Sequence, residues 1–249
     1  MSTQARDQFD ALAQAYLTSA VHAQGEDLRR VAERMAGQSE AAALDLGCGA
    51  GHLSFAMAPC VRSVVAYDLA PRMLEVVAQA ASERGFANIT TRQGPVERLP
   101  FADASFDWVC TRFSAHHWDD LGAALREARR VLRPGGGLIA IDVLGDDDPL
   151  TDTHLQAIEL LRDPSHVRDY EAAEWRAAIS DAGFVIVDER RWPLPLEFGS
   201  WVARSRTPPL MVDALRHLLA QAPPTVRERL AVQADGSFAS VTGLFEARG

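Results

Sequence analysis

Leu44-Asp45-Leu46-Gly47-Cys48-Gly49-Ala50-Gly51 joins a short apolar run to an amphipathic segment, and this stretch decides the fold. Its glycines stand at alternate positions. Glycine lets the chain turn tightly and lets a ligand touch the backbone, because no Cβ stands in the way. A helix that follows such a turn offers unpaired N–H groups to a bound ligand. The stretch therefore predicts a strand, a tight turn and a helix, with a ligand against the turn.

Outward from this loop, short apolar runs alternate with amphipathic segments. We expect strands at 41–46, 61–69, 88–93, 106–113 and 136–144, and helices at 51–58, 71–84 and 119–132. This alternation is typical of a parallel sheet that is covered on both faces and joined by right-handed crossovers. Beyond residue 145 we expect a linker at 146–154, helices at 152–162, 171–182 and 210–231, and strands at 184–192 and 238–248.

The chain of 249 residues is predicted to form a single domain. Its first 36 residues carry apolar side chains at helical spacing, and the proline-rich run that follows Arg191 interrupts the later pattern. We therefore divide 1–249 into an N-terminal helical lid (1–40), a ligand-binding core (41–191), an insertion or cap (192–235) and a closing strand (236–249).

Asp68 ends the strand expected at 61–69. A carboxylate at the tip of this strand can accept hydrogen bonds from both hydroxyls of a ribose, as it does in dinucleotide enzymes. The glycines, however, run G-x-G-x-G rather than G-x-G-x-x-G, and the G-K-S/T ending of a phosphate-binding loop is absent. The loop thus differs from both of these fingerprints.

The segment ALDLGCGAG (43–51), followed by LPFADASFDWV (99–109) and ALREARRVLRPGGGLIAIDV (124–143), resembles class I S-adenosylmethionine (SAM)-dependent methyltransferases. The resemblance is to the type-11, UbiE-like subfamily, and within it to the bacterial YafE group, with SAHHW (114–118) and DPSHVRDY (163–170) among the shared runs. It implies an α/β fold with a Rossmann-like, seven-stranded, mostly parallel sheet and one antiparallel strand. It also implies methyl transfer from SAM to a small-molecule acceptor by in-line displacement, with S-adenosylhomocysteine as product.

The resemblance assigns a set of residues to the cofactor. They are Asp45, Gly47, Gly49 and Gly51 at the methionine and ribose, Asp68 at the ribose hydroxyls, Leu69 and Met73 at the adenine, Gly94, Val96 and Glu97 at the adenine edge, Arg112 at the methionine, and Tyr16 closing over the cofactor. Tyr16 could equally be an ordinary core aromatic. The chain departs from the pattern at Pro95, where many relatives carry an Asp that contacts the exocyclic amine, so this contact would fall to the backbone N–H of Val96.

His116 and His117 follow the fourth expected strand, at the edge of the sheet where open α/β folds bind ligands. Methyl transfer needs alignment and, for a poor nucleophile, a base that takes a proton. Histidine titrates near neutrality and suits this role. Either residue could be the base, or both could only shape the pocket, and the sequence does not separate these alternatives. His166, Arg168 and Tyr170 form a second polar group that either binds the acceptor or caps local structure.

Composition narrows the function classes. The formal charge of −9 argues against a general nucleic-acid binder, which needs clustered Lys and Arg. No apolar run approaches the roughly 20 residues of a membrane span, and the N-terminus lacks the pattern of a signal peptide. The three cysteines form no metal or disulfide pattern, so we expect a cytoplasmic protein without a metal. A homodimer is the assembly that we consider.

Other functions fit parts of the same sequence. A SAM-binding regulatory or assembly protein would bind the cofactor without transferase turnover. A nicotinamide-dependent oxidoreductase could use a similar sheet, although the segment 99–109 and the missing dinucleotide fingerprint argue against it. Nucleic-acid methylation would need a basic face and, for amino methylation, a polar-Pro-aromatic tetrapeptide that the run after the fourth strand lacks.

Overall fold

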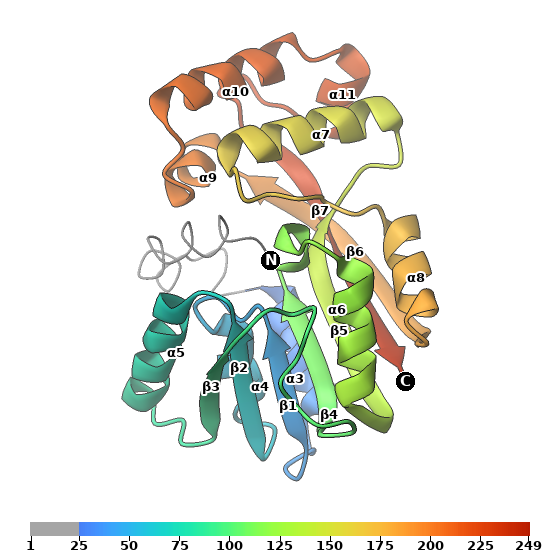
Figure 1. Ribbon diagram of the computed structural model, residues 1–249. Coiled ribbons are helices and arrows are strands. Elements are labelled where there is room, and N and C mark those ends of the chain that lie inside the picture. Colours follow the sequence, from blue (N-terminus) through green and yellow to red (C-terminus); the bar gives the residue numbers. More distant parts are fainter. Residues whose placement is uncertain (1–24) are drawn as a thin grey trace.

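Seven strands pair into one mixed sheet in the computed structural model, which describes residues 25–249 (Figure 1). The strand order is β3-β2-β1-β4-β5-β7-β6, and β7 alone runs antiparallel to its neighbours. The predicted seven-stranded, mostly parallel sheet is therefore confirmed. The strands are β1 (Ala42–Leu46), β2 (Ser63–Asp68), β3 (Ile89–Gln93), β4 (Phe106–Arg112), β5 (Leu132–Leu144), β6 (Val185–Leu196) and β7 (Phe238–Arg248).

Helices cover both faces of the sheet (Figure 1). Met35, Met57 and Trp108 belong to the apolar core on one face, and Leu125 and Trp175 belong to the core on the other. The first face carries α3 (Glu26–Met35), α4 (His52–Met57) and α5 (Pro71–Glu83), and the second carries α6 (Leu121–Val131) and α8 (Ala172–Asp181). Helix α3 lies in the segment that was expected to form a lid, and it packs on the sheet beside α4.

A cap of four helices stands beyond the carboxyl ends of the parallel strands (Figure 1). Leu155 and Ile158 precede β6 in the chain. They share an apolar core with Trp201, Leu215 and Val226, which follow β6. The cap therefore joins two separate parts of the chain, and it includes a helix before β6 that the expected insertion at 192–235 leaves out. Its helices are α7 (Pro149–Arg162), α9 (Phe198–Arg204), α10 (Pro209–Gln221) and α11 (Pro224–Arg229).

Several expected boundaries around the cap were wrong. The expected linker at 146–154 lies largely in α7, because Asp148 caps that helix by accepting hydrogen bonds from the N–H of Thr151 (3.0 Å) and from its Oγ1 (2.7 Å). The expected helix at 210–231 is divided between α10 and α11, since Pro223 and Pro224 cannot continue α10. Within residues 25–249, no helix combines the length and apolar character that crossing a membrane requires.

Candidate functional site

The loop between β1 and α4 needs glycine at two points. Gly47 and Gly51 have φ values of +65° and +85°, in the left-handed region that side chains disfavour. A Cβ at Gly47 would overlap the hydroxyl oxygen of Ser114, and one at Gly51 would lie 2.9 Å from Cγ2 of Val77. The loop is therefore pressed against both the end of β4 and helix α5, which fixes its shape at the carboxyl edge of the sheet.

Asp68 holds this loop from the end of β2. Its Oδ2 accepts a hydrogen bond from the N–H of Gly49 at 2.9 Å, and its Oδ1 accepts one from the N–H of Ala70 at 2.9 Å. These bonds orient the carboxylate at the mouth of the glycine loop, 5% exposed. The structure thus brings together the two features on which the sequence analysis depended most.

A cavity with about 610 Å³ of empty space, part of it open to solvent, lies beside the loop. Seven of the predicted site residues line it, namely Asp45, Gly47, Gly49, Asp68, Met73, Arg112 and His117. The lining also includes residues that the sequence analysis missed, namely Cys48, Ala50, His52, Leu53, Phe113 and Ser114. Since these follow the predicted ones directly in the loop, in α4 or after β4, their position at the strand ends was the available signal.

The other predicted residues lie outside this lining. Gly51 packs against α5, and Leu69 accepts a hydrogen bond from Gln93 through its carbonyl group. In the expected adenine-edge loop, Val96 is buried in the core beneath the sheet edge, and Gly94 and Glu97 flank it at the end of β3. His116 lies directly behind His117. Tyr16 falls outside the residues that the structure describes.

The side chain of Asp45 lines the cavity, and its carboxyl group is unusually buried. It is 1% exposed, and its Oδ2 accepts a hydrogen bond from Ser54 Oγ at 2.6 Å. Its Oδ1 is buried and has no hydrogen-bond partner among residues 25–249. Burial raises the pKa of Asp45 to about 7. A buried acceptor without a partner costs free energy, so this oxygen suits a ligand that brings a donor or a positive charge.

Arg112 is paired with a carboxylate from α3. Its guanidinium forms an ion pair with Asp27, and the two side chains are 5% and 4% exposed. The guanidinium also lies over the ring of Phe113, 4.6 Å from the ring centroid. Phe113 has a φ of +49°, a strained conformation for a bulky residue. This strain lies where the chain turns from β4 into the cavity wall.

His116 and His117 form the 3-10 turn Ala115–His117 after β4, yet their surroundings differ. Nδ1 of His116 lies 2.6 Å from Oδ1 of Asp142, at the end of β5. Burial lowers the pKa of His116, but the charge of Asp142 and the hydrogen bond to it outweigh this effect and raise the pKa to about 9. The ring of His116 is therefore doubly protonated and positively charged at neutral pH.

Of these two histidines, His117 is the one that lines the cavity. Its Nδ1 lies 3.0 Å from the carbonyl oxygen of Ser165, which can only accept, so in the neutral ring Nδ1 carries the proton and Nε2 the lone pair. Burial, and then the neighbouring charge of His116, hold the pKa of His117 well below its usual range. His117 is therefore neutral at neutral pH.

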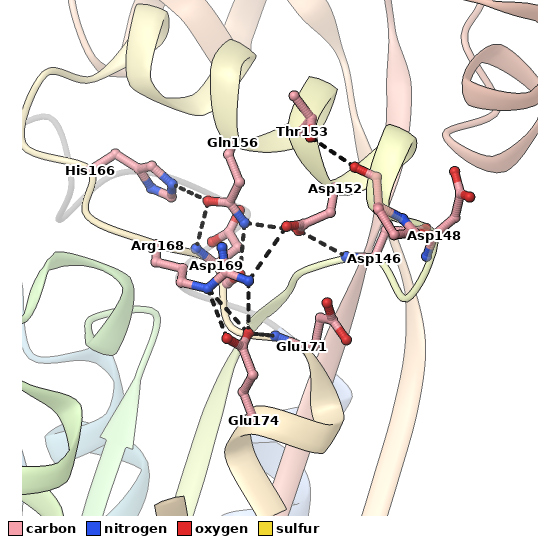
Figure 2. A network of polar contacts seen from close by, with 11 residues as sticks. Asp146, Asp148, Asp152, Thr153, Gln156, His166, Arg168, Asp169, Glu171 and Glu174 are labelled. Atoms are coloured by element: carbon pink, nitrogen blue, oxygen red, sulfur yellow. Dashed lines mark hydrogen bonds and ion pairs between the residues drawn. The ribbon is translucent and has the colours of Figure 1, made fainter.

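His166 and Arg168 of the second polar group belong to a network at the base of the cap (Figure 2), whereas the ring of Tyr170 packs against Trp175. His166 Nε2 donates to Gln156 Oε1 at 2.9 Å, and Gln156 Nε2 donates to the carbonyl oxygen of Asp169 at 2.7 Å. Arg168 pairs with Glu174 at 3.0 Å and with Asp152 at 3.5 Å (Figure 2). These side chains join α7 to the start of α8. In the described part of the chain, no group of three or more His, Cys, Asp or Glu side chains could hold a metal ion.

Comparison with known proteins gives a consistent result. Residues 44–140 match the family described as "Methyltransferase domain". The chain is 52% identical over 194 residues to the uncharacterized protein YafE of Escherichia coli (strain K12), covering 78% of this chain and 94% of that protein. It is 38% identical over 200 residues to the uncharacterized methyltransferase YcgJ of Bacillus subtilis (strain 168), covering 80% of this chain and 79% of that protein.

Solved structures resemble the whole fold. The crystal structure of YcgJ superposes with a TM-score of 0.85 at 32% identity, covering 89% of this chain and 97% of that one. A putative methyltransferase from Bacillus halodurans superposes with a TM-score of 0.86 at 29% identity, covering 90% and 99% of the two chains. The structural similarity therefore extends over about nine-tenths of this chain.

Proposed function

Since the chain belongs to the class I SAM-dependent methyltransferases of the YafE group, we propose that the cavity beside the glycine loop binds SAM and that methyl transfer to a small-molecule acceptor takes place there. The observation that carries this proposal is the convergence of Asp45, the glycine loop and Asp68 on one cavity.

The residues of the cavity fit the cofactor. The unpartnered Oδ1 of Asp45 suits the ammonium group of the methionine portion. Asp68 stands where ribose hydroxyls would donate to its carboxylate, and the backbone of Gly49 lets the ligand come close. When bound, SAM supplies a methyl group on a sulfonium whose thioether is a good leaving group. The chain then has to align the acceptor and to exclude water.

His117 is the better candidate for the base. It lines the cavity, is neutral at neutral pH, and has its proton on Nδ1, which leaves the lone pair on Nε2. His116 is already positively charged, and it does not line the cavity. We infer that His117 takes a proton from the acceptor as the methyl group is transferred.

The acceptor is proposed to be a small, partly apolar molecule. Leu53, Met73 and Phe113 supply apolar wall beside the polar groups already named. The cap, with its own apolar core, stands over the same edge of the sheet (Figure 1). An apolar wall beside polar groups fits an acceptor whose reacting part is shielded from water.

Calorimetric titration with SAM, S-adenosylhomocysteine and NADH tests the cofactor. We expect micromolar binding of both adenosyl ligands and none of NADH; failure of both adenosyl ligands to bind would overturn the proposal. Transfer of a radiolabelled methyl group from SAM into fractionated small metabolites then tests turnover. His117→Ala should keep the cofactor affinity and lose the transfer, whereas cofactor binding without any transfer would favour a regulatory protein.

A further inference from the structure

We propose that Asp142 is a positioning residue for this site: it holds His116 as a cation, and that cation, together with burial, keeps the adjacent His117 in the neutral form that can accept a proton. The inference rests on the proposed role of His117 as the base. It explains why two neighbouring histidines, which the sequence does not distinguish, are bonded to different partners.

The carboxylate of Asp142 is hydrogen-bonded to both the ring and the backbone of His116. It is 2% exposed at the end of β5, beside the strand end from which the turn of His116 begins. Oδ1 lies 2.6 Å from Nδ1 of His116 and also accepts from the N–H of Val143 at 2.9 Å. Oδ2 lies 3.2 Å from the backbone nitrogen of His116. Both oxygens therefore fix this one residue, by its ring and by its backbone.

The two imidazole rings are close enough to influence each other's protonation. Their centroids lie 4.1 Å apart, with an angle of 52° between the ring planes. A positive charge on one ring disfavours a positive charge on the other, especially where burial weakens solvent screening. Because Asp142 stabilises the charge on His116, the charge is disfavoured on His117. The pair therefore carries one positive charge, and this charge is on His116, the ring that does not line the cavity.

The proton of His117 is fixed from the side of the cap. Ser165 accepts from Nδ1 of His117 through its carbonyl oxygen at 3.0 Å. Ser165 is held in turn by Asp163, whose Oδ1 accepts from the Ser165 N–H at 2.9 Å and from its hydroxyl at 2.6 Å. The loop after α7 thus sets which nitrogen of His117 carries the proton, while Asp142 sets the charge on the neighbouring ring.

Other charged groups face His116 from the elements packed around it. They are Glu159 of α7 and Asp169 of the loop before α8, with the cation of Arg162 and the ring of His166 also near. Glu159 is paired with Arg162 at 2.9 Å. Burial, and then the charge of Glu159, raise the pKa of Asp169 well above its usual range. Among the described residues, Asp142 is the carboxylate that is hydrogen-bonded to the His116 ring.

The test is a ring-¹⁵N histidine NMR titration of the full chain with S-adenosylhomocysteine, from about pH 5 to pH 10. In the unmodified protein we expect His116 to be doubly protonated at neutral pH and to titrate near 9. His117 should be neutral, with its proton on Nδ1. In Asp142→Asn, His116 should lose about a hundredfold or more in proton affinity, and the proton affinity of His117 should rise.

Asp169→Asn is the matched control, because it replaces a second buried carboxyl group near the same ring by an amide, whereas Asp142 is the carboxylate hydrogen-bonded to that ring. It should lower the proton affinity of His116 by less than Asp142→Asn does, and it should move the titration of His117 less. His116→Gln is the second variant, in case Asp142→Asn does not fold. It removes the cation directly and should raise the proton affinity of His117 as well.

The inference fails if His116 is neutral at pH 7 in the unmodified protein. It also fails if Asp142→Asn discharges His116 without moving the titration of His117, or if Asp169→Asn moves both rings as far as Asp142→Asn does. These results are separate from the proposed function, which fails if S-adenosylhomocysteine does not bind or no methyl transfer is found.

Discussion

The proposed site has two halves, one proposed to bind the cofactor and one proposed to supply the base, and they are built in different ways. The cofactor half lies at the ends of β1 and β2, where Asp45, the glycine loop and Asp68 come from one short stretch of chain. The base half joins the turn after β4 to Asp142 of β5 and to Ser165 below the cap. The first half depends on local backbone shape, whereas the second depends on contacts between distant segments. Substitutions should therefore affect binding in one half and protonation in the other.

The glycine loop should show the largest effect. Gly47→Ala places a side chain in the left-handed region and against Ser114, so we expect a loss of about 3 kcal/mol or more in the free energy of unfolding. Gly135→Ala is the control, since Gly135 has a φ of +75° with nothing within 4 Å of the added Cβ. It should lose about 1 kcal/mol. Urea unfolding measures both, and equal losses would show that the loop is not pressed against β4.

Asp68→Asn tests the cofactor half directly. The amide has one acceptor oxygen, so it cannot bond Gly49, Ala70 and a ribose as the carboxylate does. We expect the affinity for S-adenosylhomocysteine to fall about 10- to 100-fold by calorimetry. The control is Asp107→Asn at the opposite end of the sheet, where the carboxylate accepts from the Ala42 N–H at 2.8 Å. It should bind normally; a similar loss there would indicate a general effect on the sheet.

Gln156→Leu tests whether the cap is energetically separate from the cofactor half. The change removes the bonds to His166 and to the backbone of Asp169, so we expect about 2 kcal/mol less stability. The affinity for S-adenosylhomocysteine should not change. Gln79→Leu, on the exposed face of α5, is the control and should stay within about 0.5 kcal/mol. A large loss of affinity in Gln156→Leu would mean that the cap network shapes the cofactor cavity.

The smallest effect is a pH dependence of cofactor affinity. The pKa of Asp45 is raised to about 7, so the carboxyl is protonated below that pH when no ligand is bound. An ammonium group requires the carboxylate, hence binding releases a proton and the affinity should fall by up to about tenfold per pH unit below pH 7. Above pH 7 the affinity should level off. Asp45→Asn should remove this slope, and a slope that persists would assign the proton to another group.

Much of the fold was predictable because it depends on patterns that neighbouring residues carry. Alternating apolar runs predicted the parallel part of the sheet, and the glycine spacing predicted the turn between β1 and α4. The antiparallel strand was implied by the family resemblance alone. The extent of the cap was not predictable, because the helix that completes its core, α7, precedes β6 in the chain. Asp142 was missed, although it lies two residues before the end of an apolar strand and the reasoning used for Asp68 at the end of β2 could have been extended to it.

The sequence by itself determined the glycine loop, the carboxylate at the end of β2 and the family to which the chain belongs. These features need only a few adjacent residues, since backbone conformation and strand periodicity are local properties. The tertiary structure decided which of His116 and His117 is positively charged and which of them lines the cavity. It also decided which carboxylate pairs with Arg112. Protonation and pairing depend on burial and on charges that the fold brings within a few ångströms, and distance along the chain does not reveal them.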